Sequence, residues 1–213
     1  MTSELTEYTC LNDVHFYSYR TINYMDKAEW SSGLEHLLKA EGEKCLSYFW
    51  LHGAAESYFG VCNTGLALPV IVLSTLSGAM SIGGLGIPAT AVGFVSIGVG
   101  ILQTINNFFG FSARAEGHRV AKISYGKLHR FLSVELSLPR EQRMMAADLL
   151  KYVREQMERL LEIAPAIPAN SLARYKKQFV GTEVSHPVET NGLDAIEVNS
   201  PETPANKIKI EFK

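Results

Sequence analysis

A block of 57 consecutive residues, from Ser57 to Ala113, contains no Asp, Glu, Lys, Arg or His. A helix in a soluble domain of ordinary size carries charge on the face that meets water. A block without charge on any face therefore needs lipid, or a very large protein, around it. The block predicts a membrane-inserted segment. Two alternatives remain open, namely a buried hairpin in a soluble bundle and a soluble form that inserts later, as pore-forming toxins do.

The block divides at residues 81–88, SIGGLGIP, where three glycines and a proline indicate a turn. Residues 64–83 and 87–108 flank this turn. At about 1.5 Å rise per residue, each is long enough to cross a hydrocarbon core of roughly 30 Å. The sequence thus predicts an all-α membrane protein built on a two-transmembrane helical hairpin. Lysines and arginines lie before the first span and after the second, and none lies in the turn. The positive-inside rule therefore places both termini in the cytoplasm.

Polar sequence flanks the hairpin on both sides and divides the chain into three parts. Residues 1–25 lack a sustained period and predict an irregular arm. Residues 26–163 form the two-transmembrane helical domain, and residues 164–213 predict a short helix at 171–179 and then a flexible tail. The last seven residues, KIKIEFK, alternate as an isolated strand that could add to a partner's sheet edge does, although disorder is the favoured interpretation.

Long helices are expected on either side of the spans, packed as a cytoplasmic bundle. Asp26 and Glu29 resemble a capping box, and the apolar residues that follow recur at helical spacing toward the first span. A second helix should continue from the second span to Leu138, and Pro139 should begin another over 140–163. One face of that last helix is apolar and should be buried: Met145, Leu149, Val153, Met157 and Leu160.

Small and polar residues follow one face of the second span. Their spacings of four, three, four, three and four residues place them on one heptad seam: Ala89, Gly93, Ser96, Gly100, Gln103 and Asn107. The first span carries a similar stripe: Ala67, Ser74, Gly78 and Ser81. Small residues let a neighbouring backbone approach closely, so both stripes predict helix packing. The two spans could pack together along them, or Gln103 and Asn107 could line a water-filled pathway in a homo-oligomer.

Basic residues follow the second span at the expected membrane surface: Arg114, His118, Arg119 and Lys122. Arg114, His118 and Lys122 share one helical face and could meet anionic lipid headgroups. Pairing with acids such as Glu56 is the alternative. The net charge of −2 shows no basic excess, so no nucleic-acid partner is expected.

Catalytic signatures are lacking, and no cofactor is expected. The histidines show no metal-ligand spacing, the turn glycines lack the Lys-Ser/Thr of a phosphate-binding loop, and Cys10, Cys45 and Cys62 form no Cys-x-x-Cys pair. His52 lies on the apolar side of its helix and is interpreted as a hydrogen-bonded packing residue rather than a base.

The run Leu51-His-Gly-Ala-Ala-Glu-Ser-Tyr58 and the segment from Leu68 to Gly78 together resemble the SLATT domain, the SMODS- and SLOG-associating two-transmembrane effector family, and its standalone relatives in large DNA viruses. The resemblance covers about residues 30–130, and its most telling residues are Tyr58, Asn63, Pro69, Ser74, Thr75 and Gly78. It implies a membrane hairpin that oligomerises as a membrane-perturbing effector.

Two function classes follow from these expectations. The first is a non-enzymatic pore-forming or membrane-perturbing effector that assembles through its hairpin. The second is a structural anchor or scaffold, for instance a viral membrane protein, whose cytoplasmic helices or tail hold a protein partner at the bilayer. The sequence shows no fused nucleotide-sensor domain of the kind that the family often carries nearby, which leaves both classes open.

Overall fold

The computed structural model describes residues 28–81, 88–179, 181–182 and 184–191, and every structural statement below concerns these. The predicted N-terminal arm, Asp26, most of the predicted turn and the predicted terminal strand lie outside them. The described residues contain helices and no strands, which confirms the all-α prediction at that level. The elements are α2 (Ser32–Ser81), α3 (Ala89–Phe109), α4 (Phe111–Ser137), the 3-10 helix η1 (Arg140–Gln142), α5 (Ala146–Ile163), α6 (Ala169–Gln178) and α7 (Val188–Asn191).

Helix α2 runs the length of the molecule, about 75 Å for its 50 residues, and joins the predicted amphipathic helix to the first predicted span without a break. It begins later than the sequence indicated. The Ser31 hydroxyl accepts a hydrogen bond from the Leu34 backbone N–H at 3.2 Å, the geometry of a helix N-cap. Pro69 lies inside the helix.

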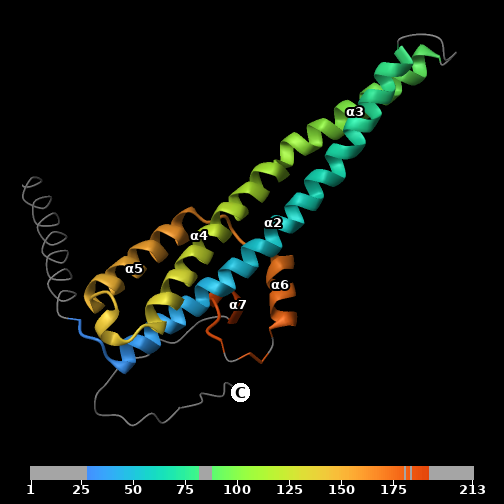
Figure 1. Cartoon of the computed structure of the whole chain (residues 1–213). Coiled ribbons are helices and arrows are strands. Elements are labelled where there is room, and N and C mark those ends of the chain that lie inside the picture. Colours follow the sequence, from blue (N-terminus) through green and yellow to red (C-terminus); the bar gives the residue numbers. More distant parts are fainter. Residues whose placement is uncertain (1–27, 82–87, 180, 183, 192–213) are drawn as a thin grey trace, which may run out of the picture.

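Helices α3 and α4 return alongside α2, so that α2 and α3 form a hairpin projecting from the rest of the molecule (Figure 1). The sequence predicted a helix continuing out of the second span, whereas the structure divides it at Gly110. This residue has φ 57° and ψ 39°, a left-handed conformation that ends α3 and precedes α4. Glycine reaches this conformation without a Cβ clash, which explains why the break falls there.

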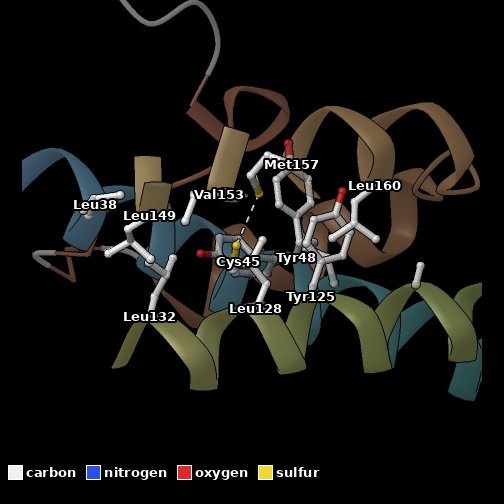
Figure 2. Packing of buried hydrophobic residues seen from close by; sticks show 13 residues of the cluster. Leu38, Cys45, Tyr48, Tyr125, Leu128, Leu132, Leu149, Val153, Met157 and Leu160 are labelled. Carbon is white, nitrogen blue, oxygen red and sulfur yellow. Dashed lines mark hydrogen bonds between the residues drawn. The ribbon is translucent and has the colours of Figure 1, made fainter. Parts of the chain in front are cut away.

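The hydrophobic core lies where α2, α4, α5 and α6 meet, at the end of α2 away from the hairpin tip (Figures 1 and 2). Of the apolar face predicted for residues 140–163, Leu149, Val153, Met157 and Leu160 are buried. Met145 is 71% exposed because α5 begins only at Ala146. Before it, the Arg143 guanidinium donates to the carbonyls of Leu136 and Leu138, which stabilises a connection that is not α-helical and contains η1.

The connection also fixes the start of α2. Arg140 donates two hydrogen bonds to the Glu35 carboxylate, at 2.9 and 2.7 Å, and Arg143 donates one at 2.6 Å. Hydrogen bonding to these arginines lowers the pKa of Glu35 to about 2. Two guanidinium groups on one carboxylate thus join α2 to the segment between α4 and α5.

The described part of the chain after α6 packs against α2, although the sequence predicted a flexible tail from residue 180. The backbone N–H of Ser185 donates to Glu43 at 2.9 Å, and the Tyr48 hydroxyl donates to both carboxylate oxygens of Glu189, at 3.1 and 2.9 Å. Residues 184–191 therefore lie along the first third of α2.

Candidate functional site: the apolar hairpin and its base

Besides a few other half-buried residues, such as Ala67 and Gly98, helices α2 and α3 each carry one stripe of buried and half-buried positions through which they pack. These positions alternate at spacings of three and four residues: Phe59, Asn63, Leu66, Val70, Leu73, Ser77 and Met80 on α2, and Val92, Val95, Val99, Leu102 and Asn106 on α3. This spacing is that of coiled-coil-like helix pairs. At its edge, the Ser77 and Ser96 hydroxyls lie 2.9 Å apart and hydrogen-bond to each other.

The predicted seam of α3 lies one residue beyond this contact stripe, a rotation of about 100° around the helix. All six seam residues, from Ala89 to Asn107, are exposed. A Cβ placed on Gly93 or Gly100 would have no neighbouring atom within 4 Å. The hairpin therefore packs mainly beside the predicted seam, although Ser96 of the seam hydrogen-bonds to Ser77. Gly100 makes no close contact with the residues that the structure describes.

The small residues of α2 are likewise offset by one residue from the contact stripe. Ser74, Gly78 and Ser81 are exposed and Ala67 is half-buried. In an antiparallel pair of right-handed helices, positions one residue after the contact stripe lie on the same flank of the pair. The two stripes therefore form one small-residue flank of the hairpin.

This flank extends toward the base of the hairpin through residues that the sequence analysis did not single out. Gly53, Ser57, Gly60 and Thr64 continue the four-three-four spacing that leads to Ala67. At the base of the hairpin, one open groove is lined by Gly53, Ser57 and Gly60 of α2 and by α4 residues that include Ser112 and Ala115. Both helices therefore turn these positions to the same side. The continued spacing could have revealed them.

The opposite flank of the hairpin is bulky and apolar. Exposed large side chains lie one residue before the contact stripe, at Val72 and Leu76 on α2 and at Phe94, Ile101 and Ile105 on α3, and Phe108 follows three residues after Ile105. Phe108 is 82% exposed. The hairpin thus has one flank of large apolar side chains and one flank of mostly small or polar side chains, on which Ile71 is a bulky exception at 59% exposed. The two flanks differ in the surroundings that they favour.

Most hydroxyl groups on the hairpin are satisfied locally. Each donates to the carbonyl oxygen four residues earlier, at 2.7 to 3.0 Å: Ser74, Thr75, Ser81, Ser96 and Thr104. The amides differ. Gln103 Nε2 donates to Asn107 Oδ1 at 3.0 Å on the exposed flank, and Asn106 Oδ1 is buried in the hairpin contact without a partner. Amide groups with unused donors or acceptors are costly in lipid, so this end of α3 calls for protein or water nearby.

The motif residues that carry the family resemblance lie along one long stretch of α2 and do not gather into a site. Tyr58 is exposed and packs edge-on against Phe59, with ring centroids 5.2 Å apart. Asn63 faces α3, while Pro69, Thr75 and Gly78 are exposed.

The basic residues after α3 do not face outward as one cluster, although Arg114 and Arg119 are exposed. Arg114 lies over the Phe59 ring at 5.9 Å, and His118 is buried. Lys122 forms an ion pair with Glu56 at 3.0 Å, and Arg119 pairs with Glu116 at 2.6 Å. Of the two alternatives for Lys122, contact with lipid headgroups and pairing with an acid, the structure contains the pairing with Glu56.

A buried histidine pair lies at the base of the hairpin, between α2 and α4. The Nδ1 atoms of His52 and His118 are 2.9 Å apart, and the two side chains are 1% and 2% exposed. Burial, together with the charge of His118, lowers the pKa of His52 to about 4, and burial lowers the pKa of His118. The structure confirms that His52 is a hydrogen-bonded packing residue. Its partner could not be inferred, because His118 is 66 residues away.

Within the described residues, no group of three or more His, Cys, Asp or Glu side chains could hold a metal ion. Both α2 and the continuous stretch of α3 and α4 are long and apolar enough to span a membrane. In the most apolar 18-residue window of each, 11% and 0% of the residues are buried. A core helix of a soluble protein would be mostly buried, so these helices expose apolar surface that the described chain leaves uncovered.

Comparison with protein-family models, curated proteins and solved structures finds no match to this chain.

Proposed function

We propose that this chain is an integral membrane protein whose α2–α3 hairpin crosses the bilayer twice and whose remaining helices form a bundle on the cytoplasmic side. The observation that carries the proposal is the hairpin's exposed surface, which is free of charge on every side. Apolar area exposed on this scale costs roughly 25 cal/mol per Å² in water, and lipid removes that cost. The basic residues at the base of α4 favour the cytoplasmic placement.

Within the membrane, the hairpins assemble into a homo-oligomer through the small-residue flank, while the bulky flank faces lipid. Close approach of backbones at Gly93 and Gly100 would give van der Waals contact that large side chains prevent. Assembly would also surround Gln103 and Asn107 with protein or water. The resulting oligomer perturbs or permeabilises the membrane, in agreement with the implied activity of the SLATT-like effectors that the sequence resembles.

Dye and ion release from liposomes containing the purified protein tests this function. Gly100→Leu should abolish release and cross-linked oligomers, because the larger side chain keeps neighbouring backbones apart. Ala91→Leu makes a comparable change on the bulky flank and should leave both unchanged. Gln103→Leu should alter ion release while the protein still inserts. If the wild-type protein releases nothing at any tested pH or nucleotide concentration, the permeabilising function is wrong.

A structural anchor is the second candidate, and exposed apolar side chains on the bundle favour it. Leu161 and Ile163 at the end of α5 are 53% and 63% exposed, on the part of the molecule that would lie in the cytoplasm. An anchor would leave ion gradients intact. Changing Leu161 and Ile163 to Ser would then release the bound cytoplasmic protein without altering membrane insertion.

A further inference from the structure

The histidine pair lies at the place where the bundle becomes the hairpin. His52 is stacked against Tyr125 of α4, with centroids 5.6 Å apart, and His118 is stacked against Phe59 of α2, with centroids 5.5 Å apart. Each imidazole therefore packs against an aromatic ring of the other helix as well as against the other imidazole. Seven residues beyond His52, Phe59 also begins the stripe through which α2 contacts α3.

The 2.9 Å contact requires at least one deprotonated Nδ1 atom, since one nitrogen must donate and the other accept. With one extra proton, a charged imidazole can still donate to a neutral one. With two extra protons, both Nδ1 atoms carry hydrogen, so the hydrogen bond is lost and two positively charged imidazoles lie in contact. Acid therefore converts an attractive contact into a repulsive one.

No carboxylate compensates for that charge among the residues that the structure describes. On α2, Tyr48 and Glu56 lie four residues before and four residues after His52, and Glu56 is paired with Lys122 of α4. From α4, Tyr125 stacks on His52, and Arg114 lies over the Phe59 ring.

The elements that follow α4 supply no counter-charge either. From α7, Glu189 accepts a hydrogen bond from the Tyr48 hydroxyl. In the connection between α5 and α6, the uncharged Pro165 ring lies beside Gly117, the residue before His118. Neither imidazole forms an ion pair with a described carboxylate.

We propose that the His52–His118 pair is an acid-sensitive latch, which holds α2 against α4 at neutral pH and separates them at the base of the hairpin when both imidazoles are protonated. Separation would expose Phe59 and Tyr125 and loosen the hairpin where it leaves the bundle. Any effect on membrane permeability depends on the proposed function, but the opening itself does not.

The size of the effect follows from the difference in proton affinity between the closed and open contact. His52 has a pKa of about 4 when buried, and an exposed imidazole has a pKa of about 6.5. The open state therefore binds more protons between these values, and the closed state loses stability as the pH falls. From about pH 7.5 to about pH 5 the ratio of open to closed rises about 30-fold for His52 alone. The lowered pKa of His118 acts in the same direction.

Hydrogen–deuterium exchange of the full-length protein in phosphatidylcholine nanodiscs measures this opening without requiring conductance. After correction for intrinsic exchange rates, protection of residues 47–60 and 112–126 should fall about 30-fold or more over that pH interval. The double variant His52→Phe/His118→Leu cannot be protonated at the pair, and its protection should change by less than about 3-fold. His129→Gln is the matched control. His129 also joins α4 to α2, through the Gly42 carbonyl at 2.9 Å, and its loss should leave the pH response intact.

Equal protection of the wild type at both pH values would overturn the latch, as would a double variant that keeps the wild-type response. If the double variant lacks protection at neutral pH, His118→Gln replaces it, because an amide can still pair with His52 and removes one titrating group. That single variant must reduce the pH response, or the proposal is wrong. Liposome release separates the two proposals. Release without an exchange response supports the permeabilising function and overturns the latch. An exchange response without release supports the latch and overturns the permeabilising function.

Discussion

Replacing Leu149 by Asp tests whether the helices outside the hairpin form a packed bundle. Leu149 of α5 is 0% exposed and lies beside Leu38 of α2 and Leu132 of α4 (Figure 2). The substitution removes most of an apolar side chain from the core and places a carboxyl group in the same space. Because the surrounding side chains are apolar, the carboxylate has no partner.

Two contributions set the expected loss of stability. Removing a buried leucine side chain costs about 2–5 kcal/mol, including the space that it leaves. The carboxylate can avoid its burial penalty by taking up a proton, which at neutral pH costs about 4 kcal/mol for a group with a pKa near 3.9. The sum, about 6–9 kcal/mol, is comparable with the whole stability of a typical domain.

Pulse proteolysis in urea, on detergent-solubilised protein, gives the free energy of unfolding of the bundle. The Leu149→Asp variant should be cleaved in little or no urea. Leu161→Asp, on the same helix at a position that is 53% exposed, should stay within about 0.5 kcal/mol of the wild type. Equal urea midpoints for the wild type and Leu149→Asp would show that this face of α5 is not buried.

Three further substitutions test particular local structures. Gly110→Ala should destabilise the protein by about 1–2 kcal/mol in thermal melting, because alanine must adopt a φ of 57° there. Gly126→Ala should cost about 1–3 kcal/mol in the same assay, since the new Cβ would lie 2.9 Å from the Phe49 ring. Tyr48→Phe removes the hydroxyl that binds Glu189, so proteolysis near residue 189 should become faster.

For each of these three substitutions, one result would contradict the expected outcome. An unchanged melting temperature for Gly110→Ala would mean that α3 and α4 form one regular helix. The same result for Gly126→Ala would mean that Phe49 moves away without cost. Proteolysis at an unchanged rate in Tyr48→Phe would mean that other contacts bind residues 184–191 to α2.

The sequence predicted the helical hairpin well because charge and turn residues are local signals. The charge-free block, the glycines of residues 81–88 and the three- and four-residue spacing of α5 each depend only on neighbouring residues. The same holds for the seam from Ala89 to Asn107, whose members do share one face of α3.

The face by which α2 and α3 meet could not be predicted in the same way. In a soluble helix the polar residues identify the solvent side, but here the contact stripe and both flanks are uncharged. Val95 and Ser96 are neighbours in sequence, yet Val95 faces α2 and Ser96 lies on the flank. Hydrophobicity does not distinguish these positions, and only packing does.

Contacts between distant residues were also beyond sequence reasoning. His52 and His118 are 66 residues apart, and Tyr48 and Glu189 are 141 apart. A histidine on an apolar helix face indicates that a partner is needed, but not which one. The break at Gly110 had only the glycine itself as a signal, within a block already rich in glycine.

Cysteine labelling most directly tests the central claim that the chain crosses a membrane twice. In a background lacking the natural cysteines, Gly84→Cys places a thiol between the two predicted spans, and Glu162→Cys places one on the exposed surface of α5. A membrane-impermeant maleimide added outside intact cells should label Gly84→Cys at once and Glu162→Cys only after the membrane is permeabilised. Labelling of Gly84→Cys from the cytoplasmic side alone, or extraction of the wild-type protein by alkaline carbonate, would contradict the two-span account.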